Sequence, residues 1–294
     1  MQYNSVLKPE TFKDKTILVT GAGSGFGRCI AHELAALGAT VLMMGRTEAK
    51  LVTVKAEIEA DNPGATCDYG CADIRDADAV EIVIDKFIAD HGEIYGLVNN
   101  AGGQFPADLE NITPNGFLAV VRSNLIGGFI VSKAVFLKSM KQHGGSIINI
   151  TADEVGGMPR MAHSGAARAG MENLTQTAAV EWAYAGVRVN AVAPGYLASS
   201  GLDTYEDPEM LEAIPHFHES VPLNRLGTES EVSSAVCFLL SEGANYINGI
   251  TLRIDGGSSL CLSSPLGRKI KRAQRNNEAY DGFHRATFPK VLQK

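Results

Sequence analysis

Two polar residues, Ser164 and Arg168, stand one turn apart at the start of a segment, 165–185, whose apolar residues have helical spacing. A guanidinium offers a fork of hydrogen-bond donors and does not lose its proton, so Arg168 can hold hydroxyl groups but cannot act as a base. A serine hydroxyl is too weak an acid to trade protons without a separate base. The pair suits anchoring a ligand and stabilising a developing negative charge. It supports poorly the removal of a proton from an unactivated alcohol.

A cluster of glycines marks the junction between the first predicted strand, 16–20, and the helix that follows from Arg28. Glycine permits positive φ angles and close backbone approach, and a helix N-terminus presents free N–H groups with a partial positive charge. At a first strand–helix junction this arrangement is typical of a pyrophosphate cradle. The run Gly21-Ala22-Gly23-Ser24-Gly25-Phe26-Gly27 therefore predicts a dinucleotide site.

The end of the second predicted strand bears on the choice of dinucleotide. An acidic residue there would bind the adenosine ribose hydroxyls and repel a 2′-phosphate. This chain has Gly45, which leaves room, and Arg46, which can form a charge-assisted pair with that phosphate. The alternative is an ordinary surface arginine in a loop. The residues favour NADP over NAD.

These residues must be positioned by a sheet, because apolar, β-branched runs alternate along the chain with longer amphipathic segments. Near-continuous hydrophobic strands that alternate with helices predict an α/β fold, a Rossmann-type doubly wound parallel sheet with helices on both faces. We expect one domain, residues 1–261, followed by a basic extension, 262–294, and we expect the irregular segment 198–221 to be a lid over the substrate. Predicted strands are 16–20, 40–44, 67–72, 95–99, 146–151, 188–192 and 251–254, and predicted helices are 28–37, 48–60, 77–90, 115–142 and 165–185.

Several motifs in order resemble the short-chain dehydrogenase/reductase superfamily over residues 12–260. They are Thr-Gly-x-x-x-Gly-x-Gly at 20–27, Asn-Asn-Ala-Gly at 99–102, Pro-Gly at 194–195 and Ile-Asp-Gly-Gly at 254–257. The resemblance implies a homotetramer and a set of coenzyme contacts. The pyrophosphate would lie on Gly21, Ser24, Gly25, Phe26 and Gly27, the adenosine beside Asp73, Ile74, Asn100, Ala101 and Gly102, the nicotinamide ribose on Arg168, and the carboxamide near Leu197 and Ser199, after Pro194 and Gly195.

The same resemblance places a substitution in the proton relay. The superfamily uses a Tyr, a Lys four residues later, a Ser on the preceding strand and an Asn. Here Ser164 takes the Tyr position, Arg168 the Lys position and Ala152, next to Thr151, the Ser position, and the Asn remains as Asn124.

Oxidising an alcohol requires a side chain that removes its proton. Reducing a carbon–carbon double bond conjugated to a thioester does not, because the charge develops on the thioester oxygen. Ser164, Thr151 or Asn124 could stabilise that enolate. Asp153 and Glu154 are candidate acids if burial raises a pKa, and solvated loop carboxylates if it does not.

The stretches 163–170 and 100–105 resemble the peroxisomal trans-2-enoyl-CoA reductase branch. The related dienoyl-CoA reductases also place Ser at the Tyr position, but they carry a Tyr just after the fifth strand, where this chain has Glu154. We therefore expect a cytoplasmic, NADPH-dependent reductase of an enoyl-CoA-type acyl thioester. The rivals are an NAD(P)-dependent alcohol or ketone dehydrogenase, for example of citronellol, and a dinucleotide-binding protein without catalysis. His163 could be a relay group or a residue that packs and caps locally.

Composition excludes other classes of function. The formal net charge is -7, and the five cysteines include no second pair at metal-ligand spacing, so we expect no metal site. Apolar stretches such as 117–121 and 125–131 are too short to span a bilayer, which predicts no membrane partner. The extension carries eight Lys or Arg against two acids, but no aromatic residues are interleaved at regular spacing and the main body is acidic, which argues against nucleic acid. It is either a solvated or subunit-covering tail or, through Arg268, Lys269, Lys271 and Arg272, a contact for substrate phosphates.

Overall fold

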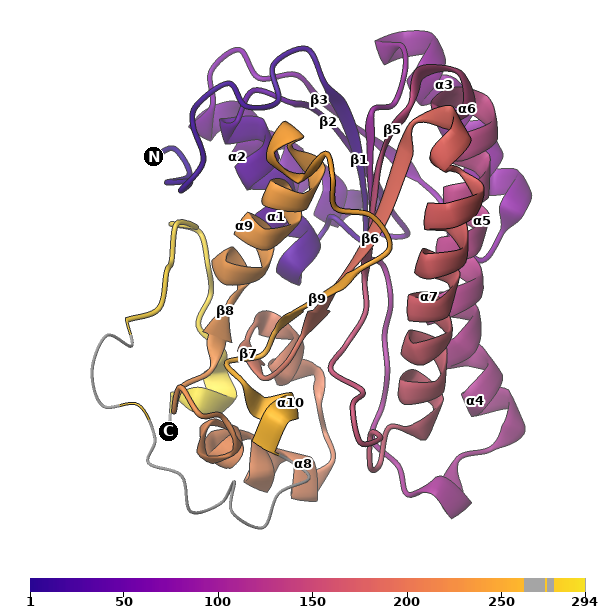
Figure 1. Cartoon of the computed structure of the whole chain (residues 1–294). Coiled ribbons are helices and arrows are strands. Elements are labelled where there is room, and N and C mark those ends of the chain that lie inside the picture. The colour runs from indigo at the N-terminus through magenta and orange to yellow at the C-terminus, as the bar shows by residue number, and fades with distance from the viewer. Residues whose placement is uncertain (262–272, 274–277, 294) are drawn as a thin grey trace.

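The computed structural model describes residues 1–261, 273 and 278–293. Over this part of the chain, seven parallel strands form one sheet in the order β3-β2-β1-β4-β5-β6-β9 (Figure 1). The α/β fold with a doubly wound parallel sheet is thus confirmed, and each predicted strand is present to within two residues at either end. The strands are β1 Thr16–Thr20, β2 Thr40–Gly45, β3 Cys67–Cys71, β4 Gly96–Asn99, β5 Gly145–Ile150, β6 Val187–Pro194 and β9 Thr251–Ile254.

The chain reverses its direction of travel across the sheet between β1 and β4, which are hydrogen-bonded neighbours. At such a switch point the loops after the two strands separate and leave a crevice beyond the carboxyl ends, where open α/β sheets bind ligands. The glycine run follows β1, and Asn100 follows β4, so both predicted coenzyme motifs meet at this place.

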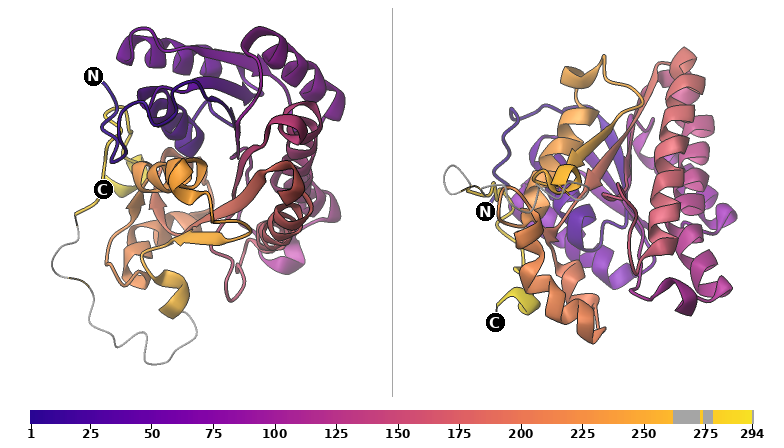
Figure 2. Two further views of the ribbon diagram at one scale, coloured as in Figure 1. Left: turned by 45° about the horizontal axis from the view of Figure 1, so that its top comes forward. Right: turned by 60° about the horizontal axis from the view of Figure 1, so that its bottom comes forward.

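Helices cover both faces of the sheet (Figures 1 and 2). On one face α1 (Gly25–Ala36), α2 (Glu48–Asp61) and α9 (Glu229–Leu240) bury Leu34, Leu51 and Val236 against the strands. On the other face α3 (Ala77–His91), α5 (Gly127–Val135) and α7 (Ala162–Glu181) bury Ile84, Val135 and Ala178. Because the strands are covered on both sides, their residues are apolar nearly throughout.

One continuous helical stretch, Pro114–His143, runs beside α7. It comprises α4 (Pro114–Val121), a π-helical turn (Arg122–Ile126), α5, a second π-helical turn (Phe136–Met140) and α6 (Lys141–His143). The two short apolar stretches of the sequence are therefore joined, and by length and composition this helix could cross a membrane, which corrects the expectation that they are too short. Half of its apolar window is buried inside the protein, as in the core helix of an α/β domain.

The segment predicted to be a lid, residues 198–221, holds short helices in place of a single regular element. They are the turn Ser200–Thr204, α8 (Pro208–Ala213) and the turn Ile214–Ser220, and along the chain they lie between the strands of a small two-stranded sheet, β7 (Leu197–Ala198) and β8 (Gly227–Thr228). We call residues 198–221 the lid segment. The remaining described helices are α10 (Ser258–Cys261) and the short turns Leu109–Asn111, Ala183–Ala185, Glu242–Ala244 and Lys290–Leu292.

Residues 278–293 of the extension fold back onto the domain, near the N-terminus of the chain (Figure 2). Phe283 is buried with Tyr3 and Cys29, and the backbone nitrogen of Asn4 donates to the carbonyl of Gly282. The guanidinium of Arg285 holds the Asp61 carboxylate at the end of α2. The four basic residues considered for substrate phosphates, Arg268, Lys269, Lys271 and Arg272, lie outside the described residues.

Candidate active site

The turn between β1 and α1 is shaped by glycines that have no room for a side chain. Gly21 has a φ of +66°, and a Cβ there would lie 2.9 Å from the Cα of Ala101. A Cβ on Gly27 would lie 2.4 Å from the carbonyl oxygen of Gly21. The backbone of the turn is therefore closely folded against the loop after β4.

Thr20 and Asn100 tie the ends of β1 and β4 together. The Thr20 hydroxyl accepts hydrogen bonds from the backbone nitrogens of Asn100 and Ala101, both at 3.0 Å. In return, Nδ2 of Asn100 donates to the Thr20 carbonyl at 3.0 Å. These bonds fix the two sides of the crevice relative to each other, so the loop 100–102 is positioned before any ligand binds.

The residues at this crevice fit a dinucleotide. Ser24 precedes α1 in an extended conformation, its side chain makes no capping hydrogen bond, and the first turn contains no acid. The first N–H groups of α1 and its partial positive charge are thus directed at the crevice without a side chain that satisfies them, as an anionic pyrophosphate requires. The absence of a Cβ at Gly21 and Gly27 permits this turn to pack closely against Asn100 and Ala101.

Ile74, Asp73 and Arg46 are the side chains of the predicted adenosine side. Ile74 is buried against Gly127, where a Cβ would come within 2.5 Å of its Cδ1. The Asp73 carboxylate is held by the Arg75 guanidinium, which lowers the pKa of Asp73 to about 2. Arg46 is exposed, and among the described residues it forms no ion pair. Its charge helps to lower the pKa of the neighbouring Asp73, and its guanidinium keeps hydrogen-bond donors for a phosphate.

Ser164 and Asn124 come together, as the sequence predicts, in the interior between α7 and the first π-helical turn. Both side chains are buried, and Nδ2 of Asn124 lies 3.5 Å from Oγ of Ser164. The side-chain oxygen of Asn124 accepts from the backbone nitrogen of Gly103 at 2.9 Å. The Ser164 hydroxyl donates to Oε1 of Gln104 at 2.6 Å. Gln104 is thus a third polar group at the site, and the sequence analysis gave it no role.

Arg168 reaches the same place from the next turn of α7. Its Nη1 donates to the carbonyl of Ile150, at the end of β5, and a Cβ on Gly102 would lie 2.7 Å from its Nη2. Burial lowers the pKa of Arg168 to about 10, so the guanidinium remains charged at neutral pH. Among the described residues no carboxylate pairs with it, and Nε has no partner. A buried charge without a counterion calls for a ligand with oxygen acceptors.

The other predicted catalytic residues face different partners. The Thr151 hydroxyl donates to the carbonyl of Val192 at 3.2 Å and lies 3.4 Å from Oε1 of Glu172. Burial and the neighbouring Glu154 raise the pKa of Glu172. Within the described part of the chain, no hydrogen bond joins Thr151 or Glu154 to Ser164. The structure therefore brings together Asn124, Ser164 and Arg168, and leaves Thr151 and Glu154 in a separate group.

Asp153 is not a solvated carboxylate. Burial, with the charge of Asp255, raises its pKa, and the Ser258 hydroxyl donates to it at 3.2 Å.

His163 packs locally, because its Nδ1 accepts from the backbone nitrogen of Ser164 at 2.8 Å and its ring meets Phe105 edge-on. Burial lowers the pKa of His163, which keeps the ring neutral.

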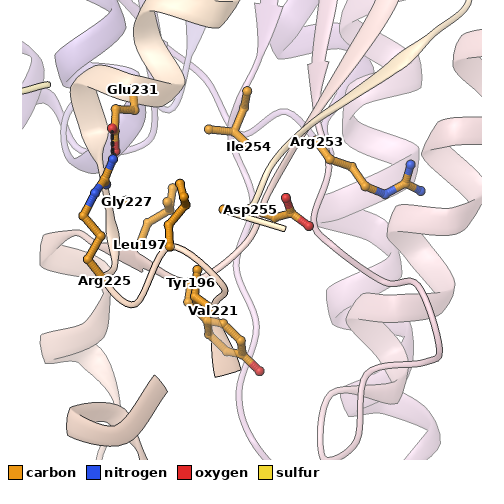
Figure 3. Close-up of a pocket in the computed structure, with 11 residues that line it drawn as sticks. Tyr196, Leu197, Val221, Arg225, Gly227, Glu231, Arg253, Ile254 and Asp255 are labelled. Atoms are coloured by element: carbon orange, nitrogen blue, oxygen red, sulfur yellow. Dashed lines mark hydrogen bonds and ion pairs between the residues drawn. The ribbon is translucent and has the colours of Figure 1, made fainter. Parts of the chain in front are cut away.

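The predicted carboxamide contacts lie where β6 passes into β7. A Cβ on Gly195 would come 2.8 Å from Cβ of Asp255, so the turn after Pro194 is tightly packed. Leu197 is buried there, and the backbone nitrogen of Ser199 donates to its carbonyl. A neighbouring pocket of about 190 Å³ shares Leu197 as a wall and is bounded by the ion pair of Arg225 and Glu231 at 2.6 Å (Figure 3).

Comparison with known proteins agrees with this geometry. The model of the family described as enoyl-(acyl carrier protein) reductase matches residues 21–259. The peroxisomal 2,4-dienoyl-CoA reductase, (3E)-enoyl-CoA-producing, of Mus musculus is 34% identical over 259 residues, which are 87% of this chain and 88% of that protein. The "Probable 2,4-dienoyl-CoA reductase", (2E)-enoyl-CoA-producing, of Bacillus subtilis (strain 168) is 37% identical over 249 residues, 84% of this chain and 97% of that protein.

Among solved structures, the citronellol catabolism dehydrogenase (AtuB) of Pseudomonas aeruginosa PAO1 is 51% identical, with a TM-score of 0.78 over 87% of this chain and 100% of that one. Levodione reductase is 32% identical, with a TM-score of 0.79 over 85% of this chain and 99% of that one. The motifs, the fold and these similarities agree. The chain belongs to the short-chain dehydrogenase/reductase family and is an oxidoreductase of that family.

Proposed function

We propose that this protein is an NADPH-dependent reductase of the conjugated carbon–carbon double bond of an enoyl-CoA-type acyl thioester. The observation that carries the proposal is the group formed by the buried side chains of Ser164 and Asn124 with the half-buried Arg168. It offers hydrogen-bond donors and a fixed positive charge, but it contains no side chain that accepts a proton near neutral pH. Such a group can stabilise an enolate, whereas it cannot readily deprotonate an alcohol.

NADPH, when bound, supplies the hydride. Arg168 holds the hydroxyl groups of the nicotinamide ribose, and its guanidinium offers the fork of hydrogen-bond donors that this role requires. Asn124 and Ser164 hold the polar end of the substrate, and the backbone at Leu197 holds the carboxamide. The unpaired Arg46 supports NADPH rather than NADH, since it can meet the 2′-phosphate.

The similarity to proteins named 2,4-dienoyl-CoA reductase, in two organisms and over most of the chain, supports an enoyl-CoA type of substrate. The test is the consumption of NADPH, followed by its absorbance, with trans-2-enoyl-CoA thioesters of increasing chain length. We expect turnover with at least one thioester and a lower KM for NADPH than for NADH. A purified, folded protein that binds NADPH but turns over no thioester at any chain length would contradict the assignment.

A second candidate is the oxidation of a branched terpenoid alcohol. The observation that favours it is the 51% identity to the citronellol catabolism dehydrogenase (AtuB). The same preparation assayed with citronellol and NAD or NADP separates the two. Alcohol oxidation faster than thioester reduction would favour this second function.

We also propose that the protein acts in the cytoplasm as a homotetramer. Apolar side chains remain exposed along the long helix and α7, namely Ile126, Phe129, Leu137 and Val180, as on a surface that another subunit covers. Sedimentation velocity would show the assembly, and a monomer at micromolar concentration would contradict it.

A further inference from the structure

A chain of hydrogen bonds links α7 to the lid segment. The Ser164 hydroxyl donates to Oε1 of Gln104 at 2.6 Å. Nε2 of the same Gln104 side chain donates to Oη of Tyr205 at 3.0 Å. One amide thus connects the buried serine of α7 with the phenol of Tyr205 in the lid segment, which lies 101 residues after Gln104 in sequence.

Tyr205 is anchored on both sides. Two residues before it, the Asp203 carboxylate accepts from the backbone nitrogens of Lys290 and Val291 at 3.1 and 3.2 Å. Two residues after it, the Asp207 carboxylate accepts two hydrogen bonds from the Arg160 guanidinium at 3.0 and 2.9 Å. A bidentate pair fixes orientation as well as distance. The position of the phenol is therefore fixed from two directions.

Arg160 joins three loops at this point. Besides Asp207 it pairs with Glu209 at 2.9 Å and Asp108 at 3.4 Å, and its carbonyl accepts from the backbone nitrogen of Ala107. Its φ of +62° is unusual for a residue with a long side chain. Such strained residues persist where the surroundings hold them, and they concentrate at functional sites. The loops around Gln104, Arg160 and Tyr205 are thus held as one unit.

The direction of the hydrogen bonds decides which group is free to donate. The Ser164 hydroxyl donates its hydrogen bond to Oε1 of Gln104, and the amide nitrogen of Gln104 donates to the phenol oxygen of Tyr205. Because Tyr205 accepts in that bond, it keeps its own hydrogen, for which the described residues provide no acceptor. Ser164 can therefore donate to the substrate only by giving up its bond to Gln104, whereas the phenol is a donor that is already free.

We infer that Tyr205 is a further residue of the active site, which donates a hydrogen bond to the substrate oxygen and is aligned by Gln104. This inference rests on the proposed function, in which negative charge develops on the thioester oxygen. A donor aimed at that oxygen stabilises the charge without giving up its proton. Among the described residues no cation contacts the phenol, so Tyr205 assists as a donor and does not act as a base.

The test compares Tyr205→Phe, which removes only the hydroxyl, with wild type and with the control Tyr246→Phe, whose hydroxyl lies on a fully exposed side chain. The inference predicts that kcat falls at least about tenfold in Tyr205→Phe, since loss of one donor to a developing oxyanion costs about that or more. The dissociation constant for NADPH should not change, and Tyr246→Phe should match wild type. A kcat within twofold of wild type in Tyr205→Phe would overturn the inference.

A double-mutant cycle separates a role in the chain from a role in lid packing. If Ser164 and Tyr205 act together through Gln104, Ser164→Ala and Tyr205→Phe combined should cost little more than the worse single variant. Gln104→Ala should reproduce the loss of Tyr205→Phe. Fold-losses in kcat that simply multiply would show independent roles and would contradict the chain.

These outcomes are distinguishable from failure of the proposed function. Wild-type turnover of enoyl thioesters tests the function. The ratio of variant to wild-type kcat tests Tyr205, and it is measured with whichever of the enoyl thioester and citronellol the wild type turns over, because both present an oxygen to the phenol. A wild type that turns over neither would contradict both statements.

Discussion

Arg168 is the residue on which the coenzyme geometry depends most. It carries a full positive charge in a buried setting, its only hydrogen bond among the described residues goes to a backbone carbonyl, and burial lowers its pKa to about 10. A guanidinium away from water is costly unless its donors are satisfied, so we expect a ligand whose oxygen atoms accept hydrogen bonds from it. The ribose hydroxyls of the coenzyme are that ligand in our account.

Arg168→Ala should therefore weaken NADPH binding by about 10- to 100-fold, since hydrogen bonds to a charged group contribute about 1.5–3 kcal/mol. Fluorescence titration of NADPH measures the change. Arg168→Lys keeps the charge but loses the fork of donors, so its affinity for NADPH should lie between those of wild type and Arg168→Ala. An Arg168→Ala variant with unchanged NADPH affinity and rate would remove this residue from the site.

At the same scale, sequence reasoning found some site residues and missed others for physical reasons. Ser164 and Arg168 could be paired because they are one helical turn apart, and helical spacing is local information. Gln104 could not be assigned a role, because its two partners, Ser164 and Tyr205, come from distant parts of the chain. Thr151 bonds a neighbouring strand and Glu172 instead, which the order of residues alone does not show.

At the scale of elements, the strands and most helices could be predicted, because buried parallel strands and amphipathic helices each have a repeating apolar pattern. The two π-helical turns in Pro114–His143 have no such pattern, yet one of them holds Asn124. The short strands β7 and β8 are also invisible in the sequence, since two residues are too few to show alternation. Irregular segments are the hardest to predict from sequence, and the lid segment, which holds Tyr205, is one of them.

At the scale of the whole molecule, residues 278–293 of the extension connect parts of the domain that are distant in sequence. Asp61 is paired with Arg285, with His284 and with the N-terminal amine. The hydrogen bond from Arg285 is the main cause that lowers the pKa of Asp61 to about 2. Further along, Lys290 and Val291 hold the lid segment through Asp203. The C-terminal residues thus connect α2 with the lid segment.

Arg285→Ala should destabilise the protein by about 2–3 kcal/mol at neutral pH, because it leaves a buried carboxylate with weaker partners. A folded-state pKa below the ordinary value of 3.8 means that the carboxylate stabilises the fold above that value and loses this effect as the pH falls through about 2. The difference from wild type should therefore shrink between pH 4 and pH 2. Urea unfolding across this range measures it.

The matched control is Arg75→Ala, which removes the partner of the more exposed Asp73. We expect Arg75→Ala to lower the free energy of unfolding by less than about 1 kcal/mol, since exposed ion pairs contribute little to stability. His32, whose pKa burial lowers to about 4, lies 3.7 Å from Asp61 and titrates in the same acid range, so the comparison at pH 7, where its ring is neutral, is the decisive one. An Arg285→Ala variant as stable as wild type at pH 7 would show that the extension does not clamp the domain.

The central claim is that Ser164, Asn124 and Arg168 support reduction of a conjugated double bond and not proton transfer with an alcohol. The direct measurement is the fate of deuterium from NADPH labelled at C4 of the nicotinamide, followed by mass spectrometry and NMR of the acyl product from crotonyl-CoA. The account predicts deuterium on the β-carbon and a solvent-derived hydrogen on the α-carbon. Deuterium found instead on a carbinol carbon, or transferred only between the coenzyme and an alcohol, would contradict it.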